Sequence, residues 1–318
     1  MLKSEIISIS QQILSDHYKT AVTINRSSGV GGGCINDAHR LETTAGLFFV
    51  KYNDASRYPG MFEAEARGLD LLRKSNTVDV PKVVGAGDTG RYSLLVLEYI
   101  DTASQEADFW ETFGAGLAAM HKKVMPENEG RPTLAPDNAA APKDRASKAH
   151  TLFGLDHDNY IGSLPQSNRR HDNWIDFFVS ERLEAQLKRA IDHSRVNRDL
   201  AQMFEKLYRH LPDFFPDEPP ALLHGDLWSG NYMCGSNGQA VIIDPAVYYG
   251  HRYMDLGMSK LFGGFSSAFY KAYDEAYPLE PSWQQSMDIA NLYPLMVHVN
   301  LFGGSYPGSV KSILRRFS

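Results

Sequence analysis

Cysteine is almost absent from this sequence: its 318 residues include only Cys34 and Cys234. Two cysteines cannot form the disulfide framework that stabilises many small secreted domains. We therefore expect a reducing compartment and predict a cytoplasmic location. The chain is long enough to bury a large core without cross-links, either as one large domain or as two packed lobes.

Long apolar runs and strong charge of one sign are also missing. No run is long enough to cross a bilayer, and the opening residues carry an early acid, Glu5, and no apolar segment of the secretory type. We therefore expect no membrane partner. The formal net charge is −6 at pH 7, which gives no support for nucleic-acid binding.

The most informative segment that is present runs from His224 to Asn231 and reads His-Gly-Asp-Leu-Trp-Ser-Gly-Asn. Asp226 and Asn231 have the spacing of the Asp and Asn in the kinase catalytic loop. In such a loop the Asp accepts the proton of an attacking hydroxyl, so Asp226 is the candidate catalytic base. These residue types also form turns and helix caps, which is the alternative interpretation.

A further acid, Asp244, follows a predicted hairpin. Residues 232–234 and 240–243 are strand-like, and residues 235–238 have the composition of a turn. A hairpin of this length returns Asp244 to the side of Asn231. Carboxylate and amide oxygens suit Mg²⁺, which takes its remaining ligands from water and nucleotide phosphates. The spacing therefore predicts Asn231 and Asp244 as magnesium ligands and favours phosphoryl transfer.

A glycine run, Gly31-Gly32-Gly33, lies between two predicted strands. Successive glycines let backbone N–H groups approach a phosphate closely. The run matches neither a Walker A motif nor a Rossmann fingerprint, so its position is more informative than its composition. We predict that it covers the phosphates of ATP.

Lys51 ends the second of the two strand-like segments that follow the glycine run, and it resembles the strand lysine that pairs with nucleotide phosphates in kinases. Glu65 falls on the apolar stripe of a predicted helix, together with Phe62, Leu69 and Leu72. An acid within such a stripe is costly to bury unless it is paired. We therefore predict an ion pair between Lys51 and Glu65.

The apolar segment 94–100 ends in polar groups where the β-rich part of the sequence stops. Its last residues, Glu98, Tyr99 and Ile100, are the candidates to bind adenine through backbone groups. A plain core strand is the alternative for this segment.

Apolar periodicity predicts the elements around these motifs. In the first 100 residues we expect helices over 3–18 and 61–73 and strands near 22–24, 38–42, 47–51, 80–84 and 94–100. Beyond them we expect helices over 109–123, 174–191, 200–211 and 254–273, with a long exposed connection over 125–148. This order predicts an α+β fold of the protein-kinase-like, two-lobed type, with a small β-rich N-terminal lobe (1–100), a larger mainly helical C-terminal lobe (101–318) and a ligand site between them.

The sequence resembles the fructosamine kinase family (fructosamine-3-kinases and ketosamine-3-kinases), a relative of the aminoglycoside phosphotransferases and choline kinases within the protein-kinase-like superfamily. The resemblance extends over most of the chain and is carried by Gly31–Asn36, Phe49–Lys51, Met61–Glu65, Tyr160–Gly162, Leu222–Trp228, Asp244–Ala246, Tyr249–His251 and Phe262–Ser267. The Trp228 form of the loop and the last two segments are the most specific to this family.

What the resemblance implies is ATP-dependent phosphorylation of the sugar O3 of ketosamines, the adducts of sugars on amines. The C3 phosphate would then eliminate next to the C2 carbonyl and free the amine, which amounts to deglycation. The implied partner is a free or protein-bound ketosamine, and a monomer and a homodimer both stay open. Asp244 is followed by Pro245-Ala246 rather than Phe-Gly, which disfavours a protein kinase controlled by loop phosphorylation.

Four residues are candidates for contact with the acceptor: Trp228, Tyr160, Gln166 and Asn168. Trp228, close to the predicted base, either stacks on the sugar or packs the loop. The other three lie in a polar segment suited to hydroxyl recognition, for which an ordinary structured loop is the alternative.

Some assignments remain open at this point. We expect His224 to orient the catalytic loop and Asp255 to hold its backbone, and Cys34 is a candidate redox-sensitive thiol within the predicted phosphate loop. The alternative function is a kinase of the same fold that acts on an aminoglycoside, choline or another alcohol. A catalytically inactive nucleotide-binding module is disfavoured, because the full set of catalytic, metal and nucleotide candidates is present.

Overall fold

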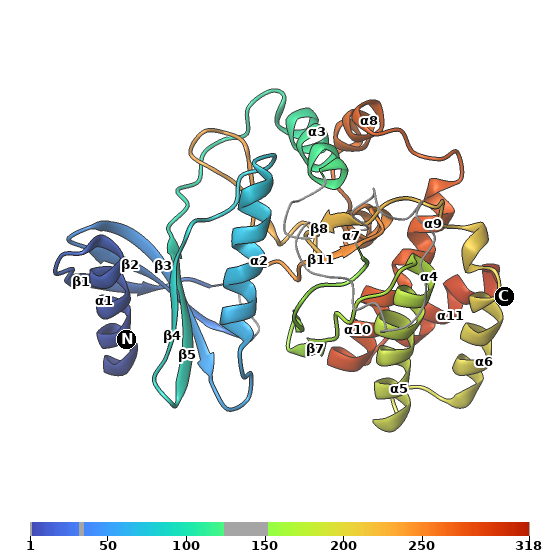
Figure 1. Ribbon diagram of the computed structural model, residues 1–318, viewed down its shortest axis with the longest axis horizontal. Helices are drawn as coiled ribbons and strands as arrows, with labels where there is room; N and C mark the ends of the chain where they lie inside the picture. Colours follow the sequence, from blue (N-terminus) through green and yellow to red (C-terminus); the bar gives the residue numbers. More distant parts are fainter. Residues whose placement is uncertain (1, 32–34, 124–151, 318) are drawn as a thin grey trace, which may run out of the picture.

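The computed structural model describes residues 2–31, 35–123 and 152–317. A sheet flanked by two helices forms one side of the molecule, and a larger group of helices with short strand pairs forms the other (Figure 1). This is the predicted α+β architecture, with the β-rich part first in the chain. The predicted connection over 125–148 lies outside the described residues.

The N-terminal sheet has five antiparallel strands in the order β1-β2-β3-β5-β4. Their bounds are Ile24–Gly29 (β1), Asp37–Thr43 (β2), Gly46–Asp54 (β3), Val83–Asp88 (β4) and Tyr92–Glu98 (β5). Helix α1 (Ser4–Tyr18) lies against one face and α2 (Met61–Ser75) against the other (Figure 1). The sheet is therefore covered on both sides.

Strand β5 shows how the sequence produces this layering, because successive side chains of a strand point to opposite faces. Leu94 and Val96 join a cluster that includes Ile6 of α1. Leu95 and Leu97 join the larger core, which extends through α2 into the helical part. The α2 face of the sheet is thus continuous with the rest of the protein.

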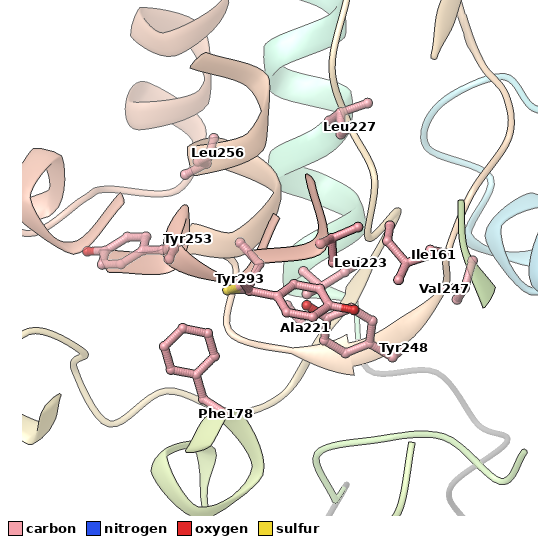
Figure 2. Close-up of a cluster of buried hydrophobic side chains, with 14 of the residues drawn as sticks. Ile161, Phe178, Ala221, Leu223, Leu227, Val247, Tyr248, Tyr253, Leu256 and Tyr293 are labelled. Atoms are coloured by element: carbon pink, nitrogen blue, oxygen red, sulfur yellow. The ribbon is translucent and has the colours of Figure 1, made fainter. Parts of the chain in front are cut away.

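The helical part contains α3 (Phe109–Lys122), α4 (Trp174–Phe177), α5 (Ala185–Asp192), α6 (Arg198–Tyr208), α7 (Tyr253–Leu261), α8 (Ser267–Ala276), α9 (Trp283–Ala290), α10 (Leu292–Phe302) and α11 (Tyr306–Phe317). Three strand pairs accompany them: β6 (Asn159–Ile161) with β7 (Leu164–Gln166), β8 (Ala221–Leu223) with β11 (Tyr248–Gly250), and β9 (Tyr232–Cys234) with β10 (Ala240–Ile242). Figure 2 shows the core at these strands, where Leu223, Leu227, Val247 and Tyr293 come together. None of the helices among the described residues is long and apolar enough to cross a membrane.

The first and fourth strands lie later in the chain than predicted. Strand β4 begins only at Val83, within the predicted segment 80–84, and Pro81 has no N–H to donate to a ladder. The strand then continues through Gly85, where an added Cβ would lie 2.7 Å from Ile13 of α1. The hydrophobic pattern predicted which residues are buried. It did not predict where the strand pairs with its neighbour, because the strand runs through a glycine that lets α1 approach the sheet.

Two predicted helices are interrupted. The segment 254–273 is split into α7 and α8, because Gly263 and Gly264 have φ angles of +98° and +73°, a left-handed conformation that ends a helix. The segment 174–191 contains a π-helical turn, Phe178–Glu184, between α4 and α5.

His251 is a fully enclosed imidazole at the end of β11, with 1% of its surface exposed. Its Nε2 donates to the carbonyl of Pro216 (3.3 Å), and its Nδ1 accepts from the N–H of Tyr253 (3.3 Å). Both bonds are made by the neutral ring. Burial, together with the positive charge of Arg252, lowers the pKa of His251 from 6.5 to about 3.

This lowered pKa predicts an acid-sensitive stability. Below pH 6.5 His251 is protonated in the unfolded chain but stays neutral in the folded chain. The contribution of His251 to the free energy of unfolding is therefore fully present above that pH and decreases below it. Because His251→Gln has no such proton, the difference in unfolding free energy between the wild type and this variant should shrink by about 1.4 kcal/mol between about pH 7.5 and about pH 5.5. Urea unfolding at the two pH values measures it. A constant difference would mean that the folded state accepts the proton.

Candidate active site

The loop 224–231, which follows β8, is held by one buried carboxylate. Asp255 of α7 accepts hydrogen bonds from the backbone N–H groups of His224 (2.7 Å) and Gly225 (2.8 Å). The Asp255 carboxylate also lies 3.2 Å from Nε2 of His121, whose Nδ1 is 2.8 Å from the hydroxyl of Tyr273. The expectation that Asp255 holds the loop backbone is confirmed.

His224 orients the loop and is not placed to act as a base. Its Nε2 donates to the carbonyl of Ile243 (2.9 Å), and its Nδ1 accepts from the N–H of Asp226 (3.3 Å). Burial lowers the pKa of His224, so the ring stays neutral. Gly225 has a φ of +83°, and a Cβ at this position would lie 2.0 Å from the carbonyl oxygen of Ala246. Only glycine fits this turn before Asp226.

Asp226 has the side-chain amide of Asn231 as its hydrogen-bond partner. Asn231 Nδ2 donates to Asp226 Oδ2 (3.0 Å) and to the Asp226 carbonyl (2.9 Å). Burial raises the pKa of Asp226 to about 7; the Asn231 hydrogen bond opposes this rise, and the negative charges of Asp244 and Asp255 add to it. A carboxylate with this pKa can accept a proton near neutral pH.

The hairpin β9–β10 returns Asp244 to the side of Asn231, as the sequence predicts. The N–H of Ile243 donates to the carbonyl of Asn231 (3.0 Å). Because Asn231 Nδ2 is directed at Asp226, the amide oxygen Oδ1 remains for another ligand. Asp244 has a φ of +53°, which is uncommon for a residue other than glycine and is typical of functional sites. Its side chain is 55% exposed.

Lys51 of β3 connects the sheet to this loop. Its ammonium forms the predicted ion pair with Glu65 of α2, and it also donates to Asp244 Oδ1 at 2.7 Å. The side chain of Lys51 is only 5% exposed. Burial by itself would lower the pKa of Lys51, but the two carboxylates outweigh it and raise that pKa. Attraction to Lys51 in turn lowers the pKa of Asp244.

The other nucleotide candidates are described only in part. Gly31 is exposed, whereas Gly32, Gly33 and Cys34 lie outside the described residues. The N–H of Glu98 donates to the carbonyl of Lys82 (2.9 Å), and the carboxylate of Glu98 accepts from the N–H of Lys82 (2.8 Å). The N–H and the carboxylate of Glu98 are therefore engaged by the protein, and the carbonyl of Glu98 with the backbone of Tyr99 and Ile100 makes up the rest of the predicted adenine segment.

Two acceptor candidates lie at the periphery of the loop. The Trp228 ring packs edge-on against Phe262, with 6.0 Å between ring centroids, and it passes so close to Gly230 that a Cβ there would be 2.4 Å away. The Tyr160 hydroxyl, on β6, donates to the carbonyl of Pro59 (3.0 Å) at the start of α2. Trp228 is half-buried in the loop that carries Asp226, and Tyr160 links the helical part to the N-terminal part.

Gln166 and Asn168 were predicted to contact the acceptor, but both are buried in the protein. Each is 1% exposed. Gln166 donates to Asn159 Oδ1 (2.7 Å) and accepts from the Tyr293 hydroxyl (2.5 Å). Asn168 donates to Asn159 Oδ1 (2.9 Å) and accepts from Arg182 (2.7 Å). Because their amides are engaged by protein groups, these residues support the site and do not reach a substrate hydroxyl.

The sequence analysis missed Arg182, which lies in the π-helical turn and has no exposed surface. Its guanidinium stacks over Tyr248 (4.0 Å) and Phe177 (4.5 Å) and donates to the carbonyl of Ser167 (2.6 Å). A single arginine in an amphipathic pattern is normally solvated, so no sequence signal marks it. The contact between Lys51 and Asp244 was missed as well.

The chain is similar in sequence to known proteins over almost its whole length. A family model, Fructosamine kinase, matches residues 6–318. The chloroplastic protein-ribulosamine 3-kinase of Arabidopsis thaliana is 38% identical over 310 residues, which cover 96% of this chain and 86% of that protein. The ketosamine-3-kinase of Mus musculus is 34% identical over 91% of this chain and 93% of its own.

Solved structures agree with the sequence matches. A crystal structure from Thermobifida fusca, named a fructosamine-3-kinase, has a TM-score of 0.78 at 32% identity and covers 96% of this chain and 98% of its own. The aminoglycoside phosphotransferase APH(4)-Ia, at 12% identity and a TM-score of 0.56 over 96% of this chain and 98% of its own, shares the kinase-like fold. The protein described here belongs to the fructosamine kinase family.

Proposed function

We propose that this protein transfers the γ-phosphoryl group of ATP to the O3 hydroxyl of a ketosamine. The observation that carries the proposal is the convergence of Lys51, Asp226, Asn231 and Asp244 from separate parts of the chain. The substrate class is taken from relatives of this chain, which are named ketosamine-3-kinase and protein-ribulosamine 3-kinase.

In this mechanism Asp226 accepts the proton of O3 as that oxygen attacks the γ-phosphorus, and ADP leaves with the bridging oxygen. The hydrogen bond from Asn231 fixes the carboxylate, and the anchored backbone of Gly225 fixes the loop that carries it. The phosphorylated sugar then loses its C3 phosphate by elimination next to the C2 carbonyl, and hydrolysis releases the amine.

The residues present suit a magnesium ion. Among the described residues no three His, Cys, Asp or Glu side chains form a cluster that could hold a metal. The free Oδ1 of Asn231 and the exposed carboxylate of Asp244 instead form the sparse oxygen set expected of Mg²⁺, which takes further ligands from phosphates and water. Bound there, the ion would neutralise charge on the transferred phosphate.

The nucleotide would lie between the sheet and this loop. Lys51 is placed to contact the phosphates, with Glu65 holding its ammonium. The glycine run would cover the phosphates, and backbone groups of the segment Glu98–Ile100 would contact adenine. We retain the predicted lobe boundary near residue 100 as part of this proposal.

The substrate class is tested by measuring ADP release with a panel of alcohols. Ribulosamines and fructosamines should release ADP, whereas aminoglycosides and choline should give only background. Release with choline or an aminoglycoside and none with ketosamines would replace this function by the alternative. The likeness to the aminoglycoside enzyme concerns the fold alone.

The base assignment predicts the effect of Asp226→Asn. The amide keeps the shape of the side chain and can still accept from Asn231, but it cannot take a proton. We expect kcat to fall by roughly 10²-fold to 10⁴-fold while ATP binding persists. Steady-state kinetics and nucleotide titration measure the two effects, with the exposed acid of α2 changed in Asp70→Asn as the control. Turnover close to that of the wild type would remove Asp226 from the mechanism.

The metal assignment predicts a selective loss in Asp244→Ala. This variant should lose activity, and its affinity should fall for the magnesium complex of ATP much more than for adenosine, because only the former uses the carboxylate. Calorimetric titration with both ligands measures the difference. Equal losses for the two ligands would indicate a folding defect instead of a metal ligand.

A further inference from the structure

A row of ring contacts leads from the catalytic loop to the protein surface. The Trp228 ring contacts Phe262 (6.0 Å between centroids), Phe262 contacts His298 (4.8 Å), and His298 contacts both Phe302 (5.5 Å) and Tyr306 (5.0 Å). We call these five residues the aromatic strip. It begins beside the base, because Trp228 is on the same loop as Asp226.

Several elements combine to form the aromatic strip. Phe262 follows α7, and its carbonyl accepts from the hydroxyl of Ser229 in the catalytic loop (3.4 Å). His298 and Phe302 are neighbours on one face of α10, four residues apart. Tyr306 begins α11. The strip is thus fixed to the helices and joined to the catalytic loop at one end.

The outer end of the strip is open to solvent. Phe302 is 57% exposed, and the only other large apolar side chains exposed in the described ranges are Tyr18 (43%) and Val30 (37%). A single exposed apolar side chain is normal in a soluble protein. Phe302 differs from Tyr18, because its ring continues a packed row that starts at the catalytic loop.

His298 gives the strip one polar atom. Its Nδ1 is 2.7 Å from the carbonyl of Pro294, which can only accept, so the proton lies on Nδ1. Nε2 is then an acceptor, and none of the described residues is bonded to it. Burial lowers the pKa of His298, which favours the neutral ring. The strip is therefore uncharged, with one acceptor between apolar rings.

A ketosamine has two ends, and the chemistry fixes which end faces the loop. Its O3 must lie beside Asp226, so the sugar occupies the end of the strip at Trp228. The nitrogen and its substituent then extend away from the base. Aromatic rings attract an alkylammonium group and its methylene chain, and a neutral imidazole can accept from its N–H.

We propose that Phe302 and Tyr306, with Phe262, form a subsite for the amine portion of the substrate. The subsite selects ketosamines whose nitrogen carries an extended apolar arm, such as an alkyl or benzyl group or the methylene chain of a lysine side chain. This inference rests on the proposed function and adds the specificity of the same site. Residues other than these three bind the sugar and carry out the phosphoryl transfer.

The test uses adducts of one sugar with methylamine, butylamine and benzylamine, and compares kcat/KM between the long and the short amines. In Phe302→Ala the ratio of kcat/KM for the butylamine adduct to that for the methylamine adduct should fall roughly fivefold to tenfold. The change should lie in KM, because the butyl chain loses its contact with the Phe302 ring. Tyr306→Ala should lower the ratio in the same direction, and Phe302→Leu should restore most of it. Tyr18→Ala, which removes an exposed aromatic ring from α1, should leave the ratio unchanged.

The outcomes separate the subsite from the reaction itself. If the wild type phosphorylates these adducts and Phe302→Ala keeps the wild-type ratio, the subsite is refuted and the proposed function stands. An equal loss for methyl and butyl adducts would likewise refute it, because the ring would then support the site as a whole. If the wild type phosphorylates no ketosamine, the proposed function fails and the subsite fails with it.

Discussion

The buried ammonium of Lys51 is the interaction on which the arrangement of the site depends. It contacts Glu65 of α2 and Asp244 after β10, so one cation joins the sheet, a helix and the segment that carries Asp244. A buried charge without partners would cost several kcal/mol. Removing Lys51 would leave the largely buried Glu65 carboxylate without its partner, whereas removing either carboxylate would still leave one ion pair. The sheet is therefore linked directly to the segment that carries Asp244.

Two neighbouring acids acquire different chemistry from this arrangement. Asp244 faces the Lys51 cation, which lowers the pKa of Asp244 and favours its ionised form, as the proposed role of metal ligand requires. Asp226 has the neutral amide of Asn231 as its partner, and burial raises its pKa to about 7. Environments that separate two carboxyl pKa values are a common way to divide base and ligand roles. Asp255, which accepts from the backbone N–H groups of His224 and Gly225, fixes the loop that carries Asp226.

Much of this site could be predicted because its parts rest on short-range patterns. Glu65 lies on the apolar stripe of α2, where a carboxylate needs a partner of opposite charge, and this predicted its ion pair with Lys51. The short hairpin predicted that Asp244 returns to the side of Asn231. The contact between Lys51 and Asp244 spans 193 residues, and no local pattern encodes it. The bounds of β4 and the break between α7 and α8 differ from the prediction for a related reason. Gly85 allows a close approach of α1, and Gly263 takes a left-handed conformation, and neither effect is visible in hydrophobic periodicity.

The roles of Gln166 and Asn168 required the structure, because a polar side chain near a site can either bind a ligand or support the protein. The difference lies in whether its donors and acceptors find protein partners, and those come from distant segments. Gln166 also donates to the carbonyl of Ala246 (3.2 Å), and Asn159 donates to that of Val247 (2.8 Å). Both carbonyls follow Asp244 in the chain. The buried amides thus hold the segment that follows Asp244, and Arg182 supports them by donating to Asn168.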